Sequence, residues 1–101
     1  MKKIALCVKQ NVPGFRGEAH LFSVEPPMEY IPEYNEPPKL TEYVIVSGVN
    51  AFGSGPETFI FPADKDGNIL SWGELDGSFQ GDIDIVRALS NAGYTVKGFL
   101  Q

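Results

Sequence analysis

Near the middle of the chain lie seven residues, Tyr43-Val44-Ile45-Val46-Ser47-Gly48-Val49, that are uncharged and rich in β-branched side chains. Such side chains fit the pleated surface of a sheet, so the run predicts a central strand. The next apolar run, Glu57-Thr58-Phe59-Ile60-Phe61, predicts a neighbouring strand. Asp64-Lys65-Asp66-Gly67-Asn68 then favours a tight turn, because Asp-Gly tolerates positive φ. We therefore expect a hairpin over residues 57–72, with residues 68–72 as the returning strand.

Shorter signals on either side complete the expected sheet. Alternating apolar residues predict strands at 3–8, 19–24 and 94–100. One helix is expected before the last strand, because Ile85, Ala88, Leu89 and Ala92 follow helical spacing. We expect Asp82 to cap this helix of about three turns, Asp84 to lie in its first turn and Gly93 to end it. The prediction is an α+β fold: a mostly antiparallel sheet of five or six strands, with one helix from the C-terminal half packed on one face.

A proline-rich segment at 25–41 interrupts these signals. Five of the eight prolines lie between residues 25 and 38. Proline lacks a backbone donor and restricts its predecessor, so we expect an extended, stiff arm that is neither helix nor central strand. It is either a plain connecting loop or an arm that reaches another copy of the chain. In the second case the interface residues would be Tyr30, Ile31 and Tyr34.

Composition limits the classes of function. A chain of 101 residues, 43% of them hydrophobic, predicts a single domain over 1–101. The net charge of −5 argues against duplex nucleic acid or an anionic membrane as partner. The apolar run Ile4–Val8 is shorter than a secretory signal requires, and the single Cys7 is typical of a reduced compartment, so we expect a cytoplasmic protein. Residues 1–16 carry four basic side chains and no acid, which either pair with the acidic body, in the fold or in another copy, or form an anion site near Arg16.

No motif for catalysis or a cofactor stands out. A calcium loop beginning at Asp64 would need glycine at its sixth position and glutamate at its twelfth, where the chain has Ile69 and Leu75. Cys7 and His20 would approach each other if their strands paired, but no third residue is marked to orient them. The alternative is that both are ordinary strand residues. We expect a protein that is not an enzyme and that has no cofactor and no metal.

The segment 72–80 is the most plausible recognition surface. It combines two aromatic rings with polar side chains and glycines just before a helix. Two of the acids between 74 and 84 could share a metal or a proton, although such acids more often cap helices. The expected ligand-binding residues are Trp72, Ser78, Phe79 and Gln80, with Arg16 and Arg87 supplying positive charge.

Several strings along residues 41–97 resemble one group of proteins. They are Tyr43-Val44-Ile45-Val46-Ser47, Gly55-Pro56-Glu57-Thr58-Phe59-Ile60-Phe61-Pro62-Ala63-Asp64, Trp72-Gly73-Glu74-Leu75-Asp76-Gly77-Ser78-Phe79, and Ala88-Leu89 with Ala92-Gly93-Tyr94. The chain is similar to small uncharacterised proteins encoded by bacteriophages and prophages. The resemblance implies a setting, the cytoplasm of a host bacterium, and assigns no role to any residue.

Small phage proteins without catalytic groups commonly act by occupancy. We therefore expect a non-enzymatic binding protein, a homo-oligomer, that sequesters a small host molecule such as a nucleotide signal of bacterial immunity. Aromatic rings would stack on the base and basic side chains would hold the phosphates. The alternatives are an inhibitor that binds and blocks a host protein, through an apolar patch or a sheet edge, and a minor structural component of the phage.

Overall fold

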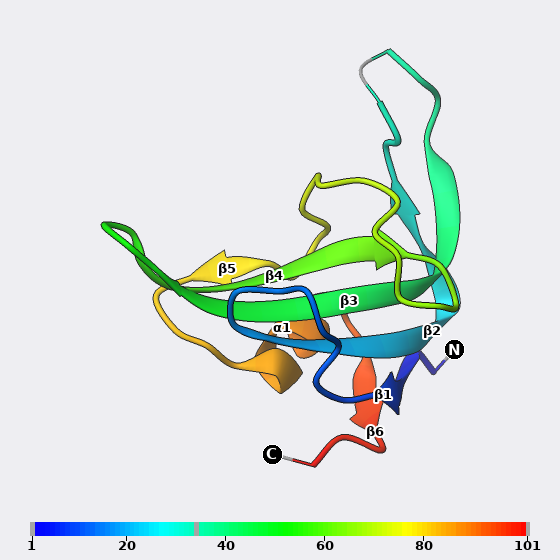
Figure 1. Cartoon of the computed structure of the whole chain (residues 1–101). Helices are drawn as coiled ribbons and strands as arrows, with labels where there is room; N and C mark the ends of the chain where they lie inside the picture. Colours follow the sequence, from blue (N-terminus) through cyan, green and yellow to red (C-terminus); the bar gives the residue numbers. More distant parts are fainter. Residues whose placement is uncertain (1, 34, 101) are drawn as a thin grey trace.

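The computed structural model, which describes residues 2–33 and 35–100, is a curled mixed sheet of six strands with one short helix (Figure 1). In chain order the elements are β1 (Ile4–Lys9), β2 (Glu18–Tyr30), β3 (Lys39–Ala51), β4 (Gly55–Ala63), β5 (Phe79–Gln80), α1 (Ile85–Asn91) and β6 (Thr95–Lys97). Across the sheet the strands run β5-β4-β3-β2-β1-β6. Every neighbouring pair is antiparallel except β1 and β6, which are parallel. The expected sheet and helix are present, but the chain is mostly sheet, so α+β describes it only loosely.

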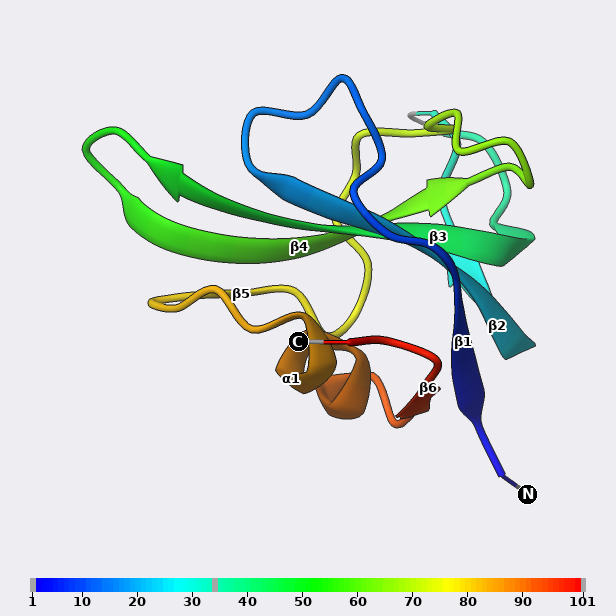
Figure 2. The ribbon, with the colours of Figure 1, turned by 60° about the horizontal axis from the view of Figure 1, so that its bottom comes forward.

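The face of the sheet that carries the helix holds the main core. Paired residues of neighbouring strands share a face, and Phe22, Val44 and Pro62 are paired in this way across β2, β3 and β4. The helix places Ile85, Ala88 and Leu89 against this face, and all three are buried as the helical spacing predicted (Figure 2). The main core also includes Ala5, Val24, Met28, Val46, Ile60, Leu75 and Tyr94.

The opposite, outer face is covered by two loops instead of a helix. Leu21, Ile45 and Phe61 are paired across the three central strands on this side. The β1–β2 loop packs Phe15 near them, and the chain after β4 adds Trp72, whose ring lies 5.3 Å from that of Phe61. Figure 2 shows both loops on the side of the sheet away from the helix. The centre of β3 is thus buried on both faces.

The expectation that the proline-rich segment is an extended arm outside the central strands is wrong at both of its ends. β2 continues through Pro26 and Pro27 to Tyr30, and β3 begins at Lys39. Between the pairs Ser23↔Tyr43 and Met28↔Thr41, β2 advances five residues while β3 advances two. Both prolines lie in this bulge, where no ladder hydrogen bond is required of them. Residues 31–33 and 35–38 lie at the end of a projecting ribbon (Figure 1).

The helix begins two residues later than predicted. Its N-cap is Asp84, whose side chain accepts a hydrogen bond from the Arg87 amide at 3.0 Å. The buried hydroxyl of Thr58 sets this start, because it donates to the Asp82 carbonyl and accepts from the Asp84 amide. The helix has seven residues and ends before Gly93, whose φ of +94° agrees with its predicted place after the helix.

Two predicted strands are largely replaced by irregular structure. Residues 68–72 form only one bridge, Ile69 to Ala63, and the last strand is limited to Thr95–Lys97. After the turn, residues 69–81 follow the free edge of β4 and bond to it at Pro56, Ile60 and Pro62. The edge of β4 is therefore covered by irregular chain, which crosses from the outer face to the helix face, and by the short β5.

The basic side chains make no ion pair within the described residues. The one contact of 4.0 Å or less between potentially opposite charges joins His20 and Glu18. Lys3 instead donates to the Ala92 carbonyl and lies 4.5 Å from the centre of the Tyr94 ring. The idea that the basic end pairs with the acidic body inside one copy is therefore not supported.

No helix of residues 2–33 or 35–100 has the length and apolarity needed to cross a bilayer.

Tyr94 joins the end of the helix to the bulge in β2. It is buried, its hydroxyl donates to the Pro26 carbonyl, and burial raises its pKa above 10.0. We expect Tyr94→Phe to lower the free energy of unfolding by about 1 kcal/mol in urea denaturation, because it leaves that carbonyl without its donor. The control is Tyr43→Phe: the hydrogen bonds of Tyr43 with Thr41 use its backbone, and its hydroxyl has no hydrogen bond to the described residues. Equal losses in both variants would contradict this role.

Asp64 organises the turn after β4. Its carboxylate accepts from the amides of Asp66 and Asn68 and from the Asn68 side chain, so the segment is explained without calcium. These hydrogen bonds, those of Asn68 first, hold the pKa of Asp64 below its ordinary 3.8. Because the pKa is lowered in the folded state, the ionised group stabilises the fold above pH 3.8 and this contribution is lost as pH falls further. We expect Asp64→Asn to lower the melting temperature at pH 7, and the difference from wild type to shrink in acid. A difference independent of pH would contradict the assignment.

Candidate functional site

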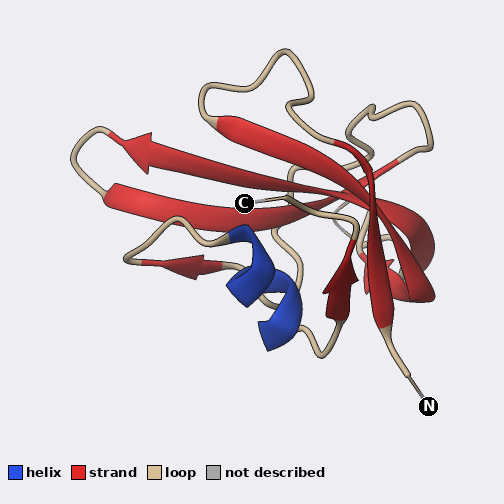
Figure 3. Cartoon of the chain, turned by 90° about the horizontal axis from the view of Figure 1, so that it is seen from below, coloured by secondary structure: helices blue, strands red, loops and turns tan. Residues whose placement is uncertain are grey.

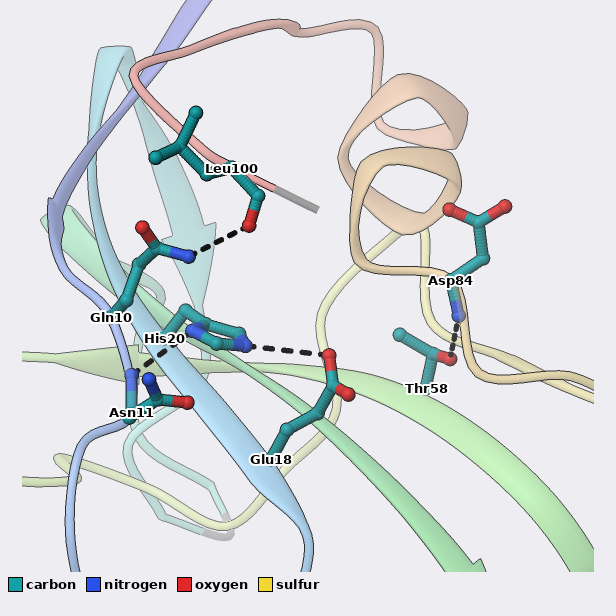
Figure 4. A network of polar contacts seen from close by, with 7 residues as sticks. All are labelled: Gln10, Asn11, Glu18, His20, Thr58, Asp84 and Leu100. Carbon is teal, nitrogen blue, oxygen red and sulfur yellow. Dashed lines mark hydrogen bonds and ion pairs between the residues drawn. The ribbon is translucent and has the colours of Figure 1, made fainter.

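A polar cavity of about 490 Å³ lies on the helix face, beside the start of β2. Three parts of the chain form it: the end of β1 with the start of β2, the segment leading into α1, and the residues after β6 (Figure 4). We call it the His20 pocket, and its lining residues are Gln10, Asn11, Glu18, His20, Ile83, Asp84, Ile85, Phe99 and Leu100.

The alternation of side chains along β2 brings Glu18 and His20 into the His20 pocket. Glu18 and His20 are two residues apart in β2, so they point to the same face of the sheet. Glu18 pairs with Gly48 of β3. A Cβ at Gly48 would lie 2.4 Å from Ile83 Cγ2, so only glycine lets Ile83 pack here as a wall of the pocket. Because Gly48 has no side chain, the segment before α1 can lie close to β3 and beside Glu18.

Hydrogen bonds determine the state of His20. Its Nδ1 accepts from the Asn11 amide at 3.1 Å, and its Nε2 lies 3.3 Å from Glu18 Oε1. Because Nδ1 accepts, the neutral ring carries its proton on Nε2 and donates it to Glu18. The Phe99 ring packs edge-on against the imidazole at 4.7 Å. The ring is only 4% exposed and is therefore held in one orientation.

The residues after β6 form one side of the pocket. Gln10 Nε2 donates to the Leu100 carbonyl at 2.9 Å, which ties residues after β6 to the end of β1 (Figure 4). On the opposite side, Thr58 holds the backbone of Asp84. The cavity is thus framed by hydrogen bonds between segments that are far apart in the sequence.

None of the six residues predicted to bind ligand lines this pocket. Trp72 is 69% exposed on the outer face, whereas Phe79 packs on the main core at the helix face. The two rings lie on opposite faces because residues 69–81 cross the edge of β4 between them. Arg87 stands 4.5 Å from the Phe79 ring, and Arg16 is exposed on the β1–β2 loop.

The remaining predicted residues have identifiable structural contacts. Ser78 Oγ accepts from the Ile60 amide and donates to the Leu75 carbonyl, and Gln80 donates to Glu57. Of the predicted interface residues, Tyr30 packs partly on the main core and Ile31 is 61% exposed, while Tyr34 lies outside the described residues.

β1 and β2 pair, which is the condition considered for an approach of Cys7 to His20, but the hydrogen bonds of His20 and the core packing of Cys7 involve other residues. Both His20 ring nitrogens are occupied by Asn11 and Glu18. Cys7 packs partly on the main core, and the described residues contain no group of three or more His, Cys, Asp or Glu that could hold a metal ion. The sequence does contain one signal for the pocket, because Glu18 and His20 stand at alternate positions of one strand.

Cys7 should react slowly in the folded protein. Burial raises the pKa of its thiol above 9.0, an effect that a hydrogen bond with the Lys9 backbone partly opposes. Because the thiolate is the reactive species, we expect iodoacetamide at pH 8 to modify Cys7 several-fold more slowly in native protein than in concentrated urea. Equal rates would show that the thiol is not protected by the fold.

Comparison with known protein families, curated proteins and solved structures found no match. The function must therefore be inferred from the chain itself, and above all from its His20 pocket.

Proposed function

We propose that this protein binds a small polar molecule in the His20 pocket and acts by occupancy. The observation that carries the proposal is the cavity of about 490 Å³ whose polar side chains are already held in place by hydrogen bonds. Such preorganisation lowers the entropy cost of binding. A concave site with a few oriented polar groups beside apolar walls is the usual form of a small-molecule site.

The state of His20 favours binding over catalysis. A general base needs an available lone pair, and the Asn11 amide already occupies the one on Nδ1. A general acid must release its proton to a substrate, and Glu18 already accepts the one on Nε2. The imidazole therefore forms a rigid side of the pocket and orients the Glu18 carboxylate. Both roles fit a binding site.

The biological role that we propose is sequestration of a host molecule. The sequence strings that resemble phage-encoded proteins suggest this role, because a small protein that removes a signalling molecule needs affinity and no chemistry. If each copy of the protein binds one molecule, the amount of signal removed is proportional to the concentration of the protein. This role requires a pocket that releases its ligand slowly, and a largely preformed site is suited to it.

A second candidate function, the blocking of a host protein, is favoured by the outer face. Leu6 and Val8 of β1 are about half exposed, and Leu70 and Trp72 are exposed on the loop side of the same sheet. Two further cavities of about 430 and 470 Å³ lie near them and share Pro27, Glu42 and Tyr43. Exposed apolar side chains around such hollows are typical of protein-binding surfaces.

Native mass spectrometry tests the proposal. Protein purified gently from bacteria is expected to carry a small-molecule adduct that is lost on denaturation. Glu18→Ala should reduce the adduct, since it removes the carboxylate from the pocket. Glu36→Ala removes an exposed carboxylate outside the His20 pocket and is expected to retain it. An adduct that is undiminished in folded Glu18→Ala would exclude this pocket. A wild-type chain without adduct that instead retains a host protein would favour the second function.

A further inference from the structure

We infer that the ligand of the His20 pocket is a small organic cation with several N–H donors, such as an alkylamine or a guanidinium compound. The inference rests on the proposed function and specifies the chemical class of its ligand. It differs from the nucleotide that the sequence suggested.

The charge of the pocket wall is the first argument. Among the described residues, the charged side chains that line the pocket are those of Glu18 and Asp84, with no lysine or arginine. The chain as a whole has a net charge of −5. Arg16 and Arg87, which were expected to hold phosphates, lie on the loop surface and over Phe79 instead. A phosphate would therefore meet negative charge here without a balancing cation, which is unfavourable in a partly enclosed site.

The hydrogen-bond inventory is the second argument. Two side-chain donors of the pocket are engaged within the protein: His20 Nε2 faces Glu18, and Gln10 Nε2 donates to Leu100. Acceptors remain. Glu18 uses Oε1 for His20, and no donor among the described residues is bonded to Oε2. A side-chain amide whose nitrogen is engaged, as in Gln10, still offers its oxygen. A ligand that satisfies these oxygens must itself donate.

The geometry is the third argument. Figure 4 shows the Glu18 carboxylate with His20 on one side and Asp84 on the other, and all three residues line the cavity. The carboxylate is about half exposed, so it is open to a ligand while its orientation is set by the imidazole. Asp84 directs Oδ1 to the Arg87 amide and adds negative charge at the far wall. Ile85, Phe99 and Leu100 provide apolar surface for the carbon stem of an amine.

Titration calorimetry with named probes tests the inference. We expect agmatine, which carries a guanidinium and an ammonium group, to bind saturably, and adenosine monophosphate to bind far more weakly. Glu18→Gln keeps an acceptor for His20 but removes the charge, and should weaken agmatine binding about tenfold. Glu36→Gln, the matched control, should bind like wild type. Amide NMR spectra establish that both variants are folded.

The outcomes separate the inference from the proposed function. If adenosine monophosphate binds as tightly as agmatine and shifts the amide signals of Glu18 and His20, the pocket binds ligands but the cation class is wrong. The same holds if the adduct from bacteria is an anion whose loss follows Glu18→Ala. If no adduct is found and neither probe moves these signals, both the inference and the proposed function fail.

Discussion

Strand β3 is buried on both faces at its centre, and the other elements are arranged to meet that requirement. Val44 and Val46 are covered from the helix side, and Ile45 is covered from the outer side. A strand with two apolar faces needs a layer on each. The chain provides one short helix for the first face and two loops for the second (Figure 3). The loops can serve as a layer because they carry Phe15 and Trp72, whose rings supply a large apolar area.

The His20 pocket is a consequence of the short layer on the helix side. A helix of seven residues is about 10 Å long, whereas β2 and β3 each have thirteen residues and extend about four times as far. The helix therefore cannot cover the whole face. At the start of β2 the residues after β6 complete the cover, and the gap between them and α1 is the cavity. The side chains of β2 at this gap are polar: the imidazole of His20 is hydrogen-bonded to Asn11 and Glu18, and the Glu18 side chain is about half exposed.

Much of the fold could be predicted from local sequence because its strongest signals are local. The β-branched run at 43–49, the stripe on α1 and the glycine after the helix each reflect the conformational preference of a few residues. The predictions are wrong where a contact between residues distant in sequence determines the local structure. Thr58 moves the helix start to Asp84, and the bulge in β2 lets Pro26 and Pro27 lie within a strand. Neither effect can be predicted from the residues that neighbour the helix start or the two prolines in sequence.

The site was harder to predict than the fold, for a related reason. Trp72 and Phe79 look like one aromatic surface because only six residues separate them, yet the path of the chain around the edge of β4 puts their rings on opposite faces. Glu18 and His20, in contrast, could have been grouped from strand alternation alone. The rest of the site could not, because Asn11 reaches the imidazole from the β1–β2 loop and Leu100 reaches Gln10 from a distant part of the chain. Alternation along one strand thus identifies which side chains share a face. Only the three-dimensional path of the chain decides whether that face is covered, and at Glu18 it is left open.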